Sequence, residues 1–171
     1  DIDGFCNEYL NAIKSSDIQV VWPMFSIEIA QDTLFDKYCP NAIKSENRCV
    51  EPFYFDDPWS YELRGKKVLV INPFSESINK QYQNRQQLWE NSKILPEFNL
   101  ITYKSIQSIC DNGPHSSWSE SLRVMKDDIS NIDFDIALLG CGAYGMPLGT
   151  FIKNELNKSS IYVGGSLQIL F

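Results

Sequence analysis

The chain has 171 residues, of which 43% are hydrophobic and 13% aromatic, enough for one domain with a substantial core but not for a second full domain. Its formal net charge of −7 opposes attraction to a phosphate backbone or an anionic membrane surface, so no nucleic-acid partner is expected. No apolar run approaches the roughly 20 residues that cross a bilayer, and the first residues lack a signal-peptide core, which predicts a soluble, cytoplasmic protein without a membrane span.

The first third of the chain predicts two helix-strand units. Residues 4–16 carry apolar side chains at helical spacing, and residues 18–22 follow as a short buried strand. Residues 27–38 return to helical spacing and stop at Pro40, because a proline disfavours helical backbone at the residue before it. Residues 49–55 alternate and are rich in aromatic side chains, which predicts a further strand.

The middle of the chain contains the clearest strand. Residues 57–63 begin with a cap residue and a proline, which predicts a short helix. Residues 68–71 are continuously aliphatic and β-branched, as in a strand that is buried on both faces. Residues 75–93 then predict a long amphipathic helix, and residues 98–103 predict another strand.

The last third continues the alternation of strands and helices. Helices are expected at residues 117–129 and 147–156, and strands at residues 134–139 and 161–163. Such alternation selects right-handed βαβ crossovers and a parallel sheet. The sequence therefore predicts an α/β, Rossmann-like three-layer α/β/α fold with a largely parallel sheet. Residues 68–71 and the two later strands are expected in one sheet, side by side or nearly so, and parallel.

A G-x-G-x-x-G pattern stands directly after one of these strands and directly before a helix. It runs from Gly140 through Gly142, Ala143 and Tyr144 to Gly145. Its glycines permit a tight turn and a close approach of a ligand, and the amides at the start of the next helix can bind an anion. Two interpretations stay open, a loop that cradles phosphate and glycines that only let the following helix pack closely on the sheet.

The end of the next strand departs from the dinucleotide-binding pattern. An acidic residue should stand there to hold a ribose hydroxyl, but Gly164 and Gly165 occupy the place, which argues against the usual NAD site. Asn72 and Ser75 follow the other central strand and should open onto the same edge of the sheet. The alternative is that Ser75 or Ser77 caps the next helix. The candidate nucleotide-binding residues are Asn72, Ser75, Gly140, Gly142, Ala143, Tyr144, Gly145, Gly164 and Gly165.

No catalytic residue or metal ligand can be assigned from the sequence. His115 stands in a loop without a carboxylate placed to orient it, and no Gly-x-Ser-x-Gly turn is present. The pairs at 56–57 and at 133 and 135 are acidic, but turn or cap roles beside strands explain them more simply. The cysteines are odd in number and form no Cys-x-x-Cys pair, which favours buried or half-buried free thiols in a reducing compartment.

Several short strings, in their order and spacing, carry a resemblance to a known family. They are YCPNA at 38–42, EPFYF at 51–55 with PWS at 58–60, GKKVLVINPF at 65–74, ILPEF at 94–98, G-x-GAYG-x-PL at 140–148 and GG-x-LQ at 164–168. Together they resemble the bacterial and viral polysaccharide-biosynthesis proteins with a GT-D-type glycosyltransferase fold. The matching strings cover the chain nearly end to end.

The resemblance implies a single Rossmann-like domain over residues 1–171 that uses a nucleotide-sugar donor and a glycan acceptor. It implies a divalent cation, Mn²⁺ or Mg²⁺, on the leaving diphosphate. The family's acidic D-x-E type motif should lie before Asp1, so the domain is expected to be incomplete at both ends, with the cation's ligands outside this chain. Two alternatives stay open, a noncatalytic module that binds a nucleotide or a partner, and an enzyme that uses NAD or S-adenosylmethionine.

Overall fold

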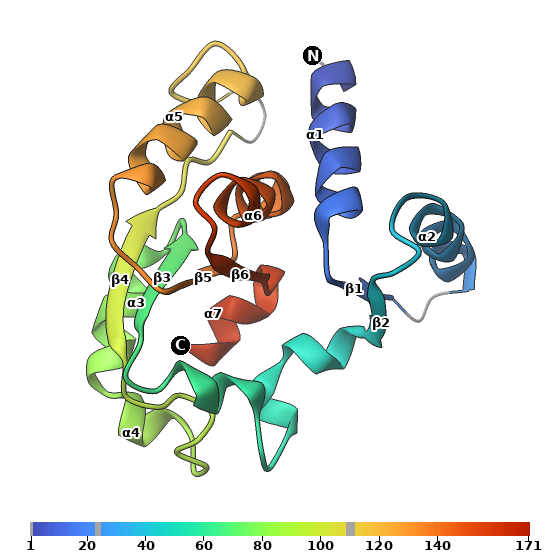
Figure 1. Ribbon diagram of the computed structural model, residues 1–171. Helices are drawn as coiled ribbons and strands as arrows, with labels where there is room; N and C mark the ends of the chain where they lie inside the picture. The colour runs from blue at the N-terminus through green and yellow to red at the C-terminus, as the bar shows by residue number, and fades with distance from the viewer. Residues whose placement is uncertain (1, 23–24, 109–111) are drawn as a thin grey trace.

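The computed structural model describes residues 2–22, 25–108 and 112–171 and contains two parallel sheets (Figure 1). The larger sheet has four strands in the order β4-β3-β5-β6, and every neighbouring pair is parallel. Its strands are β3 (Lys67–Asn72), β4 (Asn99–Lys104), β5 (Ile136–Leu139) and β6 (Ser159–Tyr162). The predicted parallel arrangement of residues 68–71, 134–139 and 161–163 is therefore confirmed.

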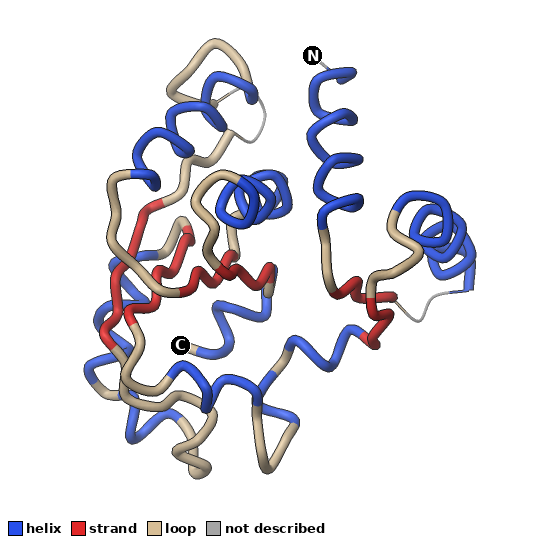
Figure 2. Tube along the Cα trace, viewed as in Figure 1, coloured by secondary structure: helices blue, strands red, loops and turns tan. Residues whose placement is uncertain are grey.

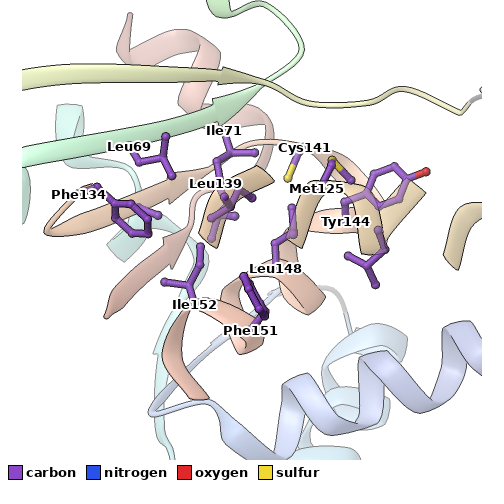
Figure 3. Close-up of a cluster of buried hydrophobic side chains, with 13 residues drawn as sticks. Leu69, Ile71, Met125, Phe134, Leu139, Cys141, Tyr144, Leu148, Phe151 and Ile152 are labelled. Atoms are coloured by element: carbon purple, nitrogen blue, oxygen red, sulfur yellow. The ribbon is translucent and has the colours of Figure 1, made fainter. Parts of the chain in front are cut away.

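Helices cover both faces of the four-stranded sheet, which confirms the three-layer fold. One face packs against α5 (Trp118–Ser130) and α6 (Gly145–Asn154), and Figure 3 shows the apolar side chains that fill this layer. The other face packs against α3 (Ser75–Gln83) and the short α7 (Leu167–Leu170). The continuous aliphatic run of β3 serves both layers, because Leu69 and Ile71 join the first cluster while its two valines join the second.

The smaller sheet pairs β1 (Ile18–Val21) with β2 (Ile43–Glu46) in parallel, beside α2 (Phe25–Tyr38). Ile18 and Ile43 lie opposite each other and are 59% and 65% exposed. The prediction of a buried strand at residues 18–22 is therefore wrong about burial, since the described residues cover neither of these side chains. Strand β2 was not predicted at all.

Helix α1 (Ile2–Ser15) precedes the smaller sheet but packs beside α6 of the larger one (Figure 1). Lys153 of α6 donates to the backbone oxygen of Ser15 at 2.6 Å and pairs with Asp17 at 2.6 Å. These contacts fasten the end of α1 to the larger unit. None of the helices in the described ranges is long and apolar enough to cross a membrane.

Residues 49–55 do not form the predicted strand. They lie in two 3₁₀ turns, η1 (Asn47–Val50) and η2 (Pro52–Tyr54). Pro52 has no amide to donate to a strand ladder, and the ring of Phe53 stacks on Trp89 at 5.5 Å instead of facing a neighbouring strand. Within residues 57–63, the predicted helix is the 3₁₀ turn η3 (Trp59–Leu63). Asp57 does not cap this turn and instead forms an ion pair with Lys93 at 3.0 Å.

The long helix predicted at residues 75–93 is also shorter than expected. α3 ends at Gln83, and only the single turn of α4 (Arg85–Leu88) follows (Figure 2). The hydroxyl of Tyr82 donates to the carbonyl of Phe98 at 2.9 Å and accepts from the amide of the same residue at 2.7 Å. This side chain anchors the end of α3 to the strand β4 that follows, which limits how far the helix can continue.

The strand order creates a topological switch point between β3 and β5. The chain leaves β3 through α3 on one face and reaches β4, whereas it leaves β5 through α6 on the other face and reaches β6. The loops that follow these adjacent strands therefore diverge at the carboxyl edge of the sheet. In open parallel α/β sheets this divergence is the usual place for a ligand.

Candidate functional site

The carboxyl ends of β3 and β5 bring the predicted site residues to one edge. This switch-point edge consists of residues 72–77, 140–145 and 164–166. Asn72 is fully buried there, where its side-chain amide donates to the carbonyl of Gly140 at 2.9 Å and its side-chain oxygen accepts from the amide of Phe74 at 2.9 Å. Asn72 therefore ties the two strand ends together and shapes the turn into α3.

The glycine loop passes through a 3₁₀ turn, η5 (Gly142–Tyr144), directly into α6. Gly142 is exposed and has a φ of +57°, a backbone conformation that residues other than glycine rarely adopt. The amide of Tyr144 bonds to Cys141 and that of Gly145 to Gly142. Among the described residues the amides of Gly142 and Ala143 have no acceptor, which leaves two donors for an anion at this helix start.

The first and last glycines of the motif have packing roles. A Cβ on Gly140 would lie 2.7 Å from the side-chain nitrogen of Asn72 and 2.9 Å from the carbonyl of Gly164. A Cβ on Gly145 would lie 2.2 Å from the ring of Tyr162. Close packing thus accounts for these two glycines, and the proposed contact with phosphate depends on the middle of the loop.

Two tyrosines that the sequence did not single out hold this loop. Tyr9 of α1 donates to the carbonyl of Ala143 at 3.0 Å, and Tyr162 at the end of β6 donates to the carbonyl of Gly142 at 3.2 Å. Burial raises the pKa of Tyr9 to about 12 and also raises that of Tyr162, so both hydroxyls stay protonated donors at neutral pH. No sequence signal links Tyr9 to a loop 134 residues away.

Tyr144 anchors the loop to the protein interior. Its side chain is buried, its ring stacks on Trp118 at 5.6 Å, and its hydroxyl shares a hydrogen bond of 2.7 Å with Ser108. It is therefore held within the protein and does not face a ligand. Cys141 lies beside it, and burial raises the pKa of its thiol to about 12, which disfavours a nucleophilic thiolate.

The start of α3 forms the second wall of the edge. Ser75 is its first residue and is buried, while Phe74 occupies the cap position and no side chain caps the helix. The alternative role of Ser75, as the cap of this helix, is therefore wrong. The amides of residues 75–77 have no acceptor among the described residues, so the positive end of the α3 dipole also faces the edge without a partner.

Gly164 and Gly165 complete the edge in the 3₁₀ turn η6 (Gly164–Ser166). Gly164 has a φ of +68°, and its carbonyl packs against Gly140. Ser166 ends this turn and directly precedes α7. Its hydroxyl donates a hydrogen bond to the carboxylate of Glu51. Through this hydrogen bond Glu51 brings an acidic side chain to the turn of Gly164 and Gly165.

The described residues do not fit a cation site of their own. No three His, Cys, Asp or Glu side chains within the described ranges gather closely enough to hold a metal ion. Asp133 pairs with Lys67, and Asp135 accepts from the Lys67 amide at 2.7 Å, at the opposite, amino edge of the sheet. The turn role predicted for these two carboxylates fits this placement.

His115, Cys6, Cys39 and Cys49 lie outside the residues that form the switch-point edge, whereas Cys141 is part of it. His115 bonds through Nδ1 to the hydroxyl of Ser121 at 3.1 Å, near the start of α5. Cys6, Cys39, Cys49 and Cys141 are free thiols. Cys6 and Cys49 are exposed, so the expectation of burial is wrong for them, and Cys110 lies outside the described residues.

Comparisons with protein-family models, with curated proteins and with solved structures found no match. The function is therefore inferred from the geometry of the switch-point edge, together with the resemblance carried by the sequence strings.

Proposed function

We propose that the switch-point edge binds the diphosphate of a nucleotide-sugar donor, and that the protein acts in glycosyl transfer during glycan synthesis. The observation that carries the binding proposal is the pair of unpartnered amides at Gly142 and Ala143, next to the uncapped start of α3. Two helix starts with free N–H groups at one edge form a favourable environment for an anion. The choice of a sugar donor is supported by the family resemblance alone.

In this proposal the chain's own residues bind and orient the leaving group. The free amides hold phosphate oxygens, and Tyr9 and Tyr162 hold the loop in place by hydrogen bonds to the carbonyls of Ala143 and Gly142. Charge that develops on the departing nucleoside diphosphate is then stabilised by preorganised donors. A divalent cation would add to this stabilisation, but no three His, Cys, Asp or Glu side chains of the described residues gather to hold one.

The alternatives differ in what the edge should bind. An NAD enzyme of the usual Rossmann type needs an acidic residue after β6, where Gly164 and Gly165 stand. A noncatalytic module would bind the nucleotide but leave the sugar attached. Hydrolysis or transfer of the sugar by the protein, assayed with Mn²⁺ and a uridine or guanosine diphosphate sugar, therefore separates the glycosyltransferase from both.

Calorimetry with uridine diphosphate tests the anion site directly. Ala143→Pro removes one of the two free amides, and losing a hydrogen bond to a charged group should weaken binding about tenfold or more. Ala143→Ser is the matched control, because it keeps the amide at an exposed position, and it should bind within about twofold of the native protein. Equal affinity of native protein and a folded Ala143→Pro variant would overturn the proposed role of the loop.

A further inference from the structure

A hollow of about 340 Å³ lies between α3 and α7, on one side of the switch-point edge. It is lined by Phe74, Ser77, Ile78, Gln81, Gln168 and Phe171. This volume lies at the lower end of the range for small-molecule sites, which are mostly apolar with a few polar groups. The hollow is therefore large enough for part of a nucleotide.

Direct contacts connect this hollow to the glycine loop. Phe74 follows Asn72, whose side chain bonds to both the Phe74 amide and the carbonyl of Gly140. On the other wall, Gln168 follows Leu167, whose side chain packs against Gly140 so closely that an added Cβ would lie 2.9 Å away. Ser77 lines the hollow from the first turn of α3, which carries the free amides.

The lining offers the two kinds of contact that a nucleobase uses. Phe74 is 48% exposed and can stack on a flat ring, while Ile78 and Phe171 supply a buried apolar floor. The carboxamides of Gln81 and Gln168 have no hydrogen-bond partner among the described residues. A carboxamide presents a donor beside an acceptor, and the edges of nucleobases present the complementary pair.

We infer that the hollow between α3 and α7 binds the nucleoside of the diphosphate ligand, with the base on Phe74 and its polar edge toward the glutamines. This inference rests on the proposed function, since it takes the diphosphate at the switch-point edge as its anchor. The base is identified only by its chemistry, and uridine and guanosine both present a donor beside an acceptor. Their diphosphates are therefore separate arms of the test.

The test compares the affinities of uridine diphosphate, guanosine diphosphate and inorganic pyrophosphate for the full chain. The native protein should bind at least one nucleoside diphosphate more tightly than pyrophosphate. Phe74→Ala should weaken that nucleotide about tenfold, as expected when a base loses a stacked ring, and leave pyrophosphate unchanged. Gln168→Met, which keeps the side-chain length but not its hydrogen bonds, should weaken the same nucleotide and also leave pyrophosphate unchanged.

Phe55→Ala is the matched control, because Phe55 is 41% exposed and is not part of the hollow, and it should leave all three affinities unchanged. If the nucleotides and pyrophosphate bind equally and neither Phe74→Ala nor Gln168→Met changes them, the nucleoside site is refuted while the anion site stands. If the native protein binds none of the three, the proposed function fails and this inference fails with it.

Discussion

The two parallel sheets of this protein differ in how completely they are covered. In the four-stranded sheet, β3 and β5 lie in the centre and apolar clusters cover both faces. In the two-stranded sheet, Ile18 and Ile43 form a neighbouring pair that stays largely exposed. Parallel pairing alone therefore does not create a core, because cover from helices on both faces is what removes apolar side chains from water.

The largest expected difference concerns the cores of the two sheets. Leu138 of β5 is fully buried, and Leu138→Ala should lower the free energy of unfolding by roughly 2–5 kcal/mol through lost burial and a residual cavity. Ile43→Ala in the smaller sheet should change it by no more than about 0.5 kcal/mol, because that side chain is exposed. Urea denaturation followed by circular dichroism measures the free energy of unfolding of both variants. Similar losses in the two variants would mean that the smaller sheet is covered in solution.

A smaller effect tests how tightly the glycine loop is packed on the larger sheet. Gly145→Ala places a methyl group 2.2 Å from the ring of Tyr162, which must move and give up its bond to the loop. Overpacking of this kind should cost roughly 1–3 kcal/mol. Gly165→Ala is the control, because a Cβ there meets nothing within 4 Å, and it should leave the melting temperature nearly unchanged.

A double variant distinguishes steric overlap from other causes. If the overlap with Tyr162 is responsible, Gly145→Ala should cost much less when Tyr162→Ala is already present. An undiminished loss in the double variant would show that Gly145 is required for another reason.

The smallest effect tests whether α1 belongs with the larger sheet. Tyr9→Phe removes the hydrogen bond from α1 to Ala143 and should cost roughly 0.5–1.5 kcal/mol. The pKa of Tyr9 is about 12 in the folded protein, against an ordinary value near 10. The unfolded chain therefore ionises first, so the stability from this half-buried hydroxyl is fully present below pH 10 and is lost as the pH rises toward 12.

Unfolding measured at several pH values between 10 and 12 should show a shallower decline for Tyr9→Phe than for the native protein. Tyr54→Phe is the control, because Tyr54 is 60% exposed, and it should follow the native curve. Identical curves for the native protein and Tyr9→Phe would mean that α1 is not docked on the loop through this hydroxyl.

Local sequence patterns determined the layered fold and the position of the candidate site. The aliphatic run of β3, the later strands and the helices between them predict a parallel sheet because each local preference agrees with the others. The same pattern places the loops after β3 and β5 at the carboxyl edge, which is why Asn72 and the glycine loop could be chosen from the sequence.

Local patterns failed where a distant contact decides the structure. The aromatic alternation of residues 49–55 resembles a strand, but Pro52 and the stacking of Phe53 on Trp89 favour 3₁₀ turns. The strand β2 was missed because its four residues, IKSE, lack a β-branched run and gain their strand geometry only by pairing with β1.

The sequence by itself determined the strand and helix alternation, the glycine turn after β5 and the absence of an acidic residue after β6. Only the tertiary structure decided what each of those glycines does. Gly145 accommodates the ring of Tyr162, Gly140 accommodates Asn72, and Tyr9 reaches the loop from the other end of the chain. The physical reason is that periodicity reports which face of an element is buried, whereas close packing and hydrogen bonds depend on partners that only folding brings together.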